Sequence, residues 1–331
     1  MTGTDPLRVR VAGEERPAWA DRTLVGQVGE GDEVIVNVEA LDLGLGSGGF
    51  DIVHVNLTRG LEDPGGAGTG MKLNYSSLQH PVEPVEALAG EGVGRPIPVL
   101  VVSLHGQLAP AAWAAARAAE DLRVGYVQTA GGALPGSLSA DVAELRRRGL
   151  LCDHVTAGPA FGGEREAISV VGSLRAAAGP LGWSAAIVGP GPGIGGSGTA
   201  LGHGGMTALD NAHAALALGL ETLLAPRMSD ADPRSRHRGL SHHTETVLRM
   251  LLAPVLVPAP ADDAAAHDLL AEACGASHEL WRREAAVEEY RDSGLPASHM
   301  GRPIEEDRLF FAAALAAGDA LAAAALVEEP A

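Results

Sequence analysis

Short runs of β-branched residues, separated by glycine and aspartate, mark the first 90 residues of the chain. The runs 34–38 and 52–57 are examples, and the glycine-rich stretch 44–49 lies between them. No segment of this region shows the 3.6-residue period of an amphipathic helix. Such a pattern is typical of short strands joined by tight turns, and it predicts a small antiparallel β domain, barrel-like in form, over residues 1–90.

From about residue 97 the pattern changes to apolar runs that alternate with amphipathic helical stretches. Strands that are apolar throughout are buried on both faces, as in a parallel sheet covered by helices. The sequence therefore predicts a doubly wound, mainly parallel α/β core over residues 91–260. The expected strands are 99–104, 123–128, 152–157, 185–188, 222–225 and 254–257. The expected helices are 110–121, 139–148, 163–178, 206–218 and 241–252.

Residues 261–331 have a high helical propensity, and we expect C-terminal helices packed on the core there. The segments 279–291 and 303–327 are the main candidates. Four prolines and three glycines between residues 81 and 98 place the boundary between the first two domains in that stretch.

The net charge narrows the class of ligand. Acidic residues outnumber Lys and Arg by 42 to 24, which gives a net charge of −18. A surface of this charge repels nucleic-acid phosphates and anionic lipids, so we expect a small-molecule ligand and neither nucleic acid nor a membrane. No run reaches 18 uninterrupted apolar residues, and the N-terminal residues lack the apolar stretch of a signal peptide.

The small numbers of cysteines and lysines argue against a disulfide-stabilised protein and against a P-loop protein. Two cysteines allow only one bridge, which a core of this size does not need, so the cytoplasm is the expected location. Of the 24 basic residues only Lys72 is a lysine, and an arginine- and alanine-rich composition is typical of bacteria with GC-rich genomes. Because Lys72 lies in Gly-Met-Lys-Leu rather than Gly-Lys-Ser/Thr, the chain has no P-loop.

The loops at the carboxyl ends of the predicted strands are where an open α/β sheet binds ligands. Glycine is concentrated in these loops, at 129–135, 158–163 and 189–205. His105 ends the first predicted strand and is followed by glycine, so we take it as a candidate acid/base residue. A role in capping the core is the alternative for His105.

The loop 189–199 follows an apolar strand, and three of its glycines match the G-x-G-x-x-G motif. In that motif, backbone N–H groups and a helix N-terminus face a phosphate. Arg227, rather than an acidic residue, follows the next strand, which suits a phosphate better than the ribose diol of NAD. We therefore expect a nucleotide or another phosphorylated ligand, with a purely structural turn as the alternative. The residues expected to hold the phosphate are Gly191, Gly193, Gly196, Ser197 and Thr199.

A second candidate segment spans residues 230–244, where three histidines and three arginines fall within ten residues. Arg236 and Arg238 alternate along a stretch that we expect to be extended, so both can grip a phosphate or a carboxylate. A solvated basic segment leading into a capped helix is the alternative interpretation.

Ser241 fits the N-cap position of the helix that follows, which places His242 and His243 in the first helical turn. The helix dipole disfavours a charged imidazole there, so we expect both rings to stay neutral and to act as a base or as a ligand.

A metal site is the rival hypothesis. His237, His242 and His243 together with Asp230 or Asp232 supply nitrogen and oxygen donors for zinc or a similar ion, and His105 or His203 could complete the set. The spacing of these histidines is not a zinc signature, and adjacent residues of a helix diverge by about 100°.

These segments carry a resemblance to a bacterial family of unknown function, domain of unknown function 3866. The resemblance lies in residues 42–49, 105–107, 129–135, 189–199 and 237–243, which span most of the chain. It therefore implies a likeness to a whole protein. The family has no established activity, so the resemblance implies no role for any residue.

The residues thus predict an enzyme that binds a nucleotide or another phosphorylated small molecule. In this hypothesis Arg236 and Arg238 neutralise the charge, while His105, His242 or His243 moves a proton. A metal-dependent hydrolase and a non-catalytic small-molecule regulator are the alternatives. The cofactor, the substrate and the reaction class stay open, and so does the formation of a homo-oligomer.

Overall fold

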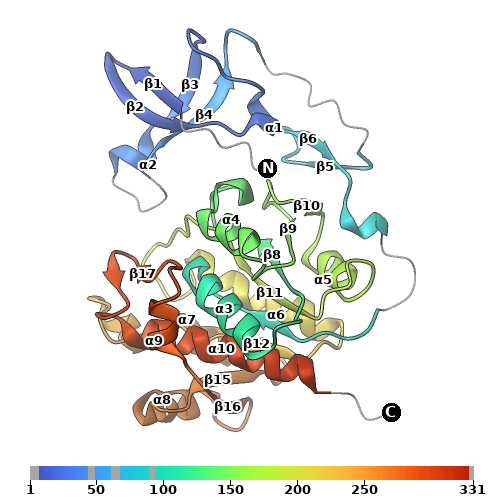
Figure 1. Cartoon of the computed structure of the whole chain (residues 1–331), viewed down its shortest axis with the longest axis vertical. Helices are drawn as coiled ribbons and strands as arrows, with labels where there is room; N and C mark the ends of the chain where they lie inside the picture. The colour runs from blue at the N-terminus through green and yellow to red at the C-terminus, as the bar shows by residue number, and fades with distance from the viewer. Residues whose placement is uncertain (1–6, 44–48, 61–67, 89–93, 328–331) are drawn as a thin grey trace. The chain divides into compact units, whose positions relative to one another are not determined.

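The computed structural model describes residues 7–43, 49–60, 68–88 and 94–327. The chain divides into two compact units, Met1–Pro84 and Val85–Ala331. Each unit has its own apolar core. Figure 1 shows the helices and strands of both units.

The first unit is a small β domain, as predicted. Its four-stranded sheet has the order β1-β2-β4-β3, in which β1–β2 and β3–β4 pair antiparallel and β2–β4 pair parallel. Within the described ranges no pairing joins β1 to β3, so the sheet is curled and open rather than a closed barrel. Its elements are β1 (Leu7–Val11), β2 (Glu14–Trp19), α1 (Arg22–Val25), β3 (Val34–Asn37), α2 (Glu39–Asp42), β4 (Asp51–Asn56) and the hairpin β5 (Gly70–Lys72) and β6 (His80–Val82).

The second unit contains an eight-stranded sheet in which every pairing is parallel, which confirms the predicted α/β class. The strand order is β10-β9-β8-β11-β7-β12-β15-β16. The strands are β7 (Val99–Val101), β8 (Val124–Thr129), β9 (Asp153–Ala157), β10 (Arg165–Ala167), β11 (Ala185–Pro190), β12 (Thr222–Leu224), β15 (Leu256–Pro260) and β16 (Glu279–Arg283). Four further strands are two residues long and pair outside this sheet, β13 with β14 and β17 with β18. They are β13 (Met228–Ser229), β14 (Gly239–Leu240), β17 (Ser298–His299) and β18 (Arg302–Pro303).

Helices cover both faces of this sheet (Figure 1). Alternate residues of β7 point to opposite faces: Val99 and Val101 join one apolar cluster and Leu100 joins the other. The first cluster includes α5 (Val170–Ala178), α6 (Thr207–Ala217), α7 (His242–Met250) and α8 (Ala264–Cys274). The second includes α3 (Leu108–Ala118), α4 (Ala140–Arg147), α9 (Val287–Arg291) and α10 (Arg308–Leu326). Single 3₁₀ turns are η1 (Val85–Leu88), η2 (His105–Gln107), η3 (Gly136–Leu138), η4 (Gly204–Met206) and η5 (Ser235–His237).

Two predicted helices are partly wrong. The stretch 163–178 begins with the edge strand β10, and α5 starts only after the N-cap Ser169, whose side chain accepts a hydrogen bond from the N–H of Gly172. The stretch 279–291 begins with β16, which pairs with β15 along all five residues. Glu and Arg favour helices when propensity alone decides. The open edges of β9 and β15 override that preference because they offer partners to the backbone groups that face them.

Helix α10 is the one helix in the described ranges that is long and apolar enough to cross a membrane. However, 72% of its 18-residue apolar stretch is buried inside the protein. It packs along α3, and Gly318 permits the closest approach because a Cβ there would overlap the carbonyl oxygen of Ala111. The apolar character of α10 therefore serves the core of the second unit.

We expect Gly318→Ala to destabilise the second unit by roughly 1–3 kcal/mol through overpacking against Ala111. In an unhindered helix the same change would stabilise by about 1 kcal/mol, so the sign of the effect identifies the clash. Urea unfolding followed by circular dichroism measures it. An unchanged or increased stability would contradict the close packing of α3 and α10.

Candidate functional site

The strand order creates a switch point at the carboxyl end of β7. From β7 the chain proceeds outward through β8 and β9 on one side, and later through β12, β15 and β16 on the other. Ligand sites of open α/β sheets lie at such points. The segments that follow β7, β11 and β12 therefore meet at the carboxyl-end edge of the sheet. The site residues predicted from the sequence belong to these segments.

Gln107 connects two of these segments. Its buried side-chain oxygen accepts hydrogen bonds from the backbone N–H groups of Ser103 (3.1 Å) and Leu104 (3.2 Å). Its side-chain NH₂ group donates to the carbonyl of Pro226 (3.1 Å). One amide thus holds the end of β7 against the segment that follows β12, a contact that the sequence alone did not indicate.

The glycine-rich loop after β11 folds into a hairpin of its own. The N–H of Ser197 donates to the carbonyl of Gly202 (2.7 Å), and the N–H of Gly204 donates to that of Gly195 (2.9 Å). The hydroxyls of Ser197 and Thr199 lie 2.9 Å apart, and Thr199 also accepts from the N–H of Gly202. Among the donors expected to face a phosphate, the N–H and the hydroxyl of Ser197 are therefore used within the loop, and α6 begins only at Thr207.

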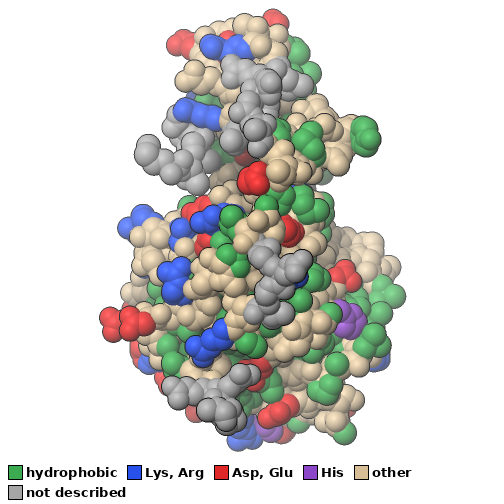
Figure 2. Space-filling model, turned by 90° about the vertical axis from the view of Figure 1, so that its right-hand side faces the viewer, with side chains coloured by type: hydrophobic (Ala, Val, Ile, Leu, Met, Phe, Trp, Pro, Cys, Tyr) green, Lys and Arg blue, Asp and Glu red, His purple; other side chains and the backbone are tan. Residues whose placement is uncertain are grey.

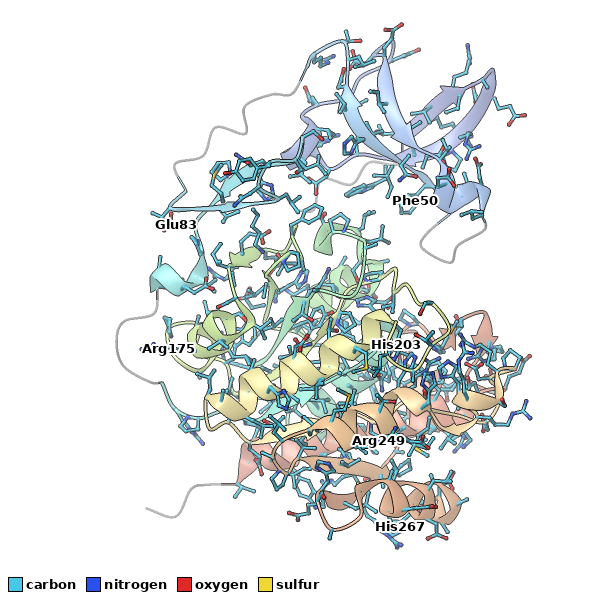
Figure 3. All side chains as sticks on the ribbon, turned by 180° about the vertical axis from the view of Figure 1, so that it is seen from behind. Phe50, Glu83, Arg175, His203, Arg249 and His267 are labelled. Atoms are coloured by element: carbon cyan, nitrogen blue, oxygen red, sulfur yellow. The ribbon has the colours of Figure 1, made fainter. Side chains whose placement is uncertain are left out.

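Packing accounts for one of the three motif glycines and backbone conformation for another. A Cβ on Gly191 would overlap the side chain of Gln128, and Gly193 has a left-handed backbone with φ +83°. A Cβ on Gly196 would make only ordinary contact with His203. The hairpin returns the chain to the sheet edge and places His203 beside the start of α7 (Figure 3).

Four histidines, His203, His237, His242 and His243, gather there, and we name them the histidine cluster. The rings of His203 and His243 stack with centroids 3.4 Å apart and planes inclined by 6°. The His242 ring lies 4.5 Å from His243 and 4.8 Å from His237. The loop after β11 and the first turn of α7 thus bring together residues about 40 positions apart in the chain.

Ser241 is the N-cap of α7 and organises part of the cluster. Its hydroxyl oxygen accepts from the N–H of His243 (3.3 Å) and lies 2.7 Å from Nδ1 of His237. One hydroxyl therefore starts the helix and orients a neighbouring ring.

A buried guanidinium lies against the cluster. Arg227 is 4% exposed, and its side chain donates to Nδ1 of His243 at 3.0 Å. A guanidinium has no acceptor, so His243 must carry its own proton on Nε2. Arg227 also contacts the carboxylate of Asp232 at 3.5 Å, and the same carboxylate pairs more closely with Arg234 at 2.8 Å.

Burial and nearby arginines keep the cluster uncharged at neutral pH. Burial, followed by the charge of Arg227, lowers the pKa of His237 to about 3 and that of His243 to about 2. Burial also lowers the pKa of His203 and of His242, with smaller effects from neighbouring positive groups. Each neutral ring offers one nitrogen lone pair.

Arg236 and Arg238, the two arginines predicted to bind an anion, have different surroundings. The guanidinium of Arg236 reaches the glycine-rich loop, 3.9 Å from where a Cβ of Gly198 would stand. Its charge acts on both His203 and His242. Arg238 instead donates to the backbone carbonyl of Asp232 at 3.4 Å. Within the described part of the chain, Arg236 forms no ion pair.

The sequence model of one protein family matches residues 17–318, which is most of the chain. The chain belongs to this family, DUF3866, protein of unknown function. No curated protein and no solved structure matches the chain.

Two of the predicted site residues of this DUF3866 protein have other partners. His105 is buried, with Nε2 2.8 Å from the hydroxyl of Ser139 and 3.7 Å from the carboxylate of Asp141. Asp230 is exposed, and its N–H donates to Asp307. The described contacts therefore do not bring His105 or Asp230 to the cluster. A three-histidine set takes the place of the proposed His237, His242 and Asp230 set: the ligand atoms of His203, His242 and His243 all lie within 4.8 Å of one another.

His154 belongs to the surroundings of His105. Its ring stacks on Tyr126 at 5.4 Å, its Nε2 lies 3.2 Å from the side-chain oxygen of Gln128, and burial lowers its pKa to about 3. Because the unfolded residue titrates near pH 6.5, the unfolded chain takes up the proton first as the pH falls.

We therefore expect His154 to make the folded protein lose stability between pH 6.5 and about 3, by up to about 1.4 kcal/mol per pH unit. His154→Gln keeps a donor for Gln128 and removes the titration, so its stability should vary less with pH than that of the wild type. Urea midpoints at pH 7, 6, 5 and 4 test this. Parallel pH profiles for the two proteins would show that His154 is not held neutral by burial.

Proposed function

We propose that this DUF3866 protein is an enzyme that binds a small phosphorylated molecule at the edge of the sheet formed by β11, β7 and β12. The observation that carries the proposal is Arg236, an exposed guanidinium with no carboxylate partner among the described residues, next to Gly198 and to neutral imidazoles. A guanidinium binds phosphate oxygens through two parallel hydrogen bonds.

The local balance of charge supports an anionic ligand. In a chain with a net charge of −18, five arginines gather around this site: Arg227, Arg234, Arg236, Arg238 and Arg302. The buried carboxylates of Asp232 and Asp307 pair with Arg234 and Arg302. The charge of Arg236 is left for a ligand.

The loop geometry favours recognition by side chains over the backbone cradle of a dinucleotide site. Hydrogen bonds inside the hairpin use the N–H groups of Ser197, Gly202 and Gly204. We therefore favour a phosphoryl group bound by the side chain of Arg236, either free or as part of a nucleotide. A pyrophosphate bound by the backbone of this loop is the less favoured ligand. The neutral histidines lie beside it and offer lone pairs to a substrate proton or to a metal ion.

The proposal also includes a small-molecule ligand, a location in the cytoplasm and a bacterial origin. On the face drawn in Figure 2, described Lys and Arg side chains lie in small groups among acidic and hydrophobic ones, which supports a small-molecule ligand over nucleic acid. Both cysteines are unpaired thiols, which suits a reducing cytoplasm. The arginine-rich, lysine-poor composition supports a bacterial origin.

Thermal-shift titration of chelator-treated, untagged protein tests the proposal, with inorganic phosphate, a nucleoside monophosphate and a sugar phosphate as probes. We expect stabilisation by at least one probe and a loss of affinity of roughly 10–100-fold in Arg236→Gln, the cost of a hydrogen bond to a charged group. Arg249→Gln, an exposed arginine at the far end of α7, is the matched control (Figure 3).

The proposal fails if none of the probes stabilises the protein, or if Arg236→Gln and Arg249→Gln bind alike. Phosphate binding without turnover of any phosphorylated substrate would favour the non-catalytic regulator.

A further inference from the structure

Two ring nitrogens of the histidine cluster are buried without a partner. Among the residues that the structure describes, neither Nδ1 of His203 nor Nε2 of His242 has a hydrogen-bond partner. A buried polar atom without a partner is costly, and in native proteins it often marks a bound water or ion.

The position of the proton on His203 is determined by its surroundings. Its Nε2 lies 3.1 Å from the carbonyl oxygen of Ala200, which can only accept, so the proton is on Nε2. The lone pair is therefore on the partnerless Nδ1. A histidine that ligates a metal commonly has this arrangement, with the second ring nitrogen donating to a backbone carbonyl.

Gly205 leaves a small space beside the stacked rings of His203 and His243. A Cβ on this residue would lie 3.1 Å from Nδ1 of His203 and 3.3 Å from Nδ1 of His243, closer than side chains normally pack. Both nitrogens therefore face the same small space, at the start of η4 and below the glycine-rich hairpin.

From these observations we propose that His203, His242 and His243 bind a divalent transition-metal ion of the zinc type. Their ligand atoms lie within 4.8 Å of one another, and tetrahedral zinc needs nitrogens about 3.4 Å apart. Binding therefore requires the stacked rings of His203 and His243 to rotate so that both lone pairs point to one ion. Three protein ligands leave a fourth position open, which is the pattern of catalytic rather than structural zinc sites.

His243 is the ligand that must change its partner. Its Nδ1 now accepts the hydrogen bond of Arg227, so a metal ion bound there replaces that contact. Arg227 keeps its contact with Asp232. The guanidinium of Arg227 would stay beside His243 and would offset the negative charge of a ligand that completes the metal shell.

This metal site goes beyond the proposed function and does not depend on a phosphorylated ligand. If both exist, the ion and Arg236 act on the same ligand. The ion would supply Lewis-acid chemistry there, and Arg236 would help to hold the oxygen on which it acts.

The test uses untagged full-length protein that has been stripped with a chelator and dialysed. Isothermal titration with Zn²⁺, together with the visible spectrum of added Co²⁺, should show one site per chain with a tetrahedral spectrum. We expect His203→Ala and His242→Ala each to weaken Zn²⁺ binding at least 100-fold. His267→Ala, on α8 and away from His203, should bind as the wild type does (Figure 3).

Circular dichroism of the metal-free variants checks the fold. His203→Asn, in the exposed hairpin, serves as a second variant if His242→Ala is unfolded. Absence of a site in the wild type overturns the proposal, and so does equal Zn²⁺ affinity in the His203 and His267 variants. Arg236→Gln separates this proposal from the previous one, because it should lose phosphate binding and leave Zn²⁺ affinity within threefold of the wild type.

Discussion

The arrangement of the site depends on one buried charge, the guanidinium of Arg227. Removing it from water is unfavourable, and burial lowers its pKa to about 10. It still carries its proton at neutral pH, because the lowered value lies well above 7. Its positive charge helps to keep His243 and His237 neutral, and its hydrogen bond to His243 determines which nitrogen of that ring holds the proton.

The carboxylates around Arg227 connect this charge to distant parts of the second unit. Asp232 joins Arg227 to Arg234, and Arg302 lies 3.7 Å from the same carboxylate. Arg302 also pairs with Asp307, which accepts a hydrogen bond from the hydroxyl of Ser229. A buried ion network of this kind is weak evidence for stability, but it gives the segment after β12 one defined conformation.

Much of this fold could be predicted from the sequence because buried parallel strands are apolar throughout. The strands β7, β11, β12 and β15 carry most of that signal. Strands β8 and β9 carry it only in part, because they contain Gln128, Asp153 and His154. Strand β16 does not carry it, since an edge strand rich in Glu and Arg resembles a helix until its neighbour is known. His242, His243 and Arg236 could be found because their histidine- and arginine-rich segment follows a strand. His203 was harder, since its position depends on hydrogen bonds that close a hairpin. His105 was predicted as a site residue because it follows a strand. The sequence does not show on which side of the sheet its ring lies, so this prediction could not be made more specific.

Helix α10 has a consequence for the order of events during synthesis. It is the last described element of the chain, yet it covers one face of the sheet, and Asp307, directly before it, ties the segment after β12 in place. While the ribosome still holds these residues, this face of the nascent sheet is covered by α3, α4 and α9 alone, and Ser229 lacks its carboxylate acceptor. The candidate site can therefore be completed only after α10 has emerged from the ribosome, so a chain that stops before residue 308 would be a target for chaperones and proteases.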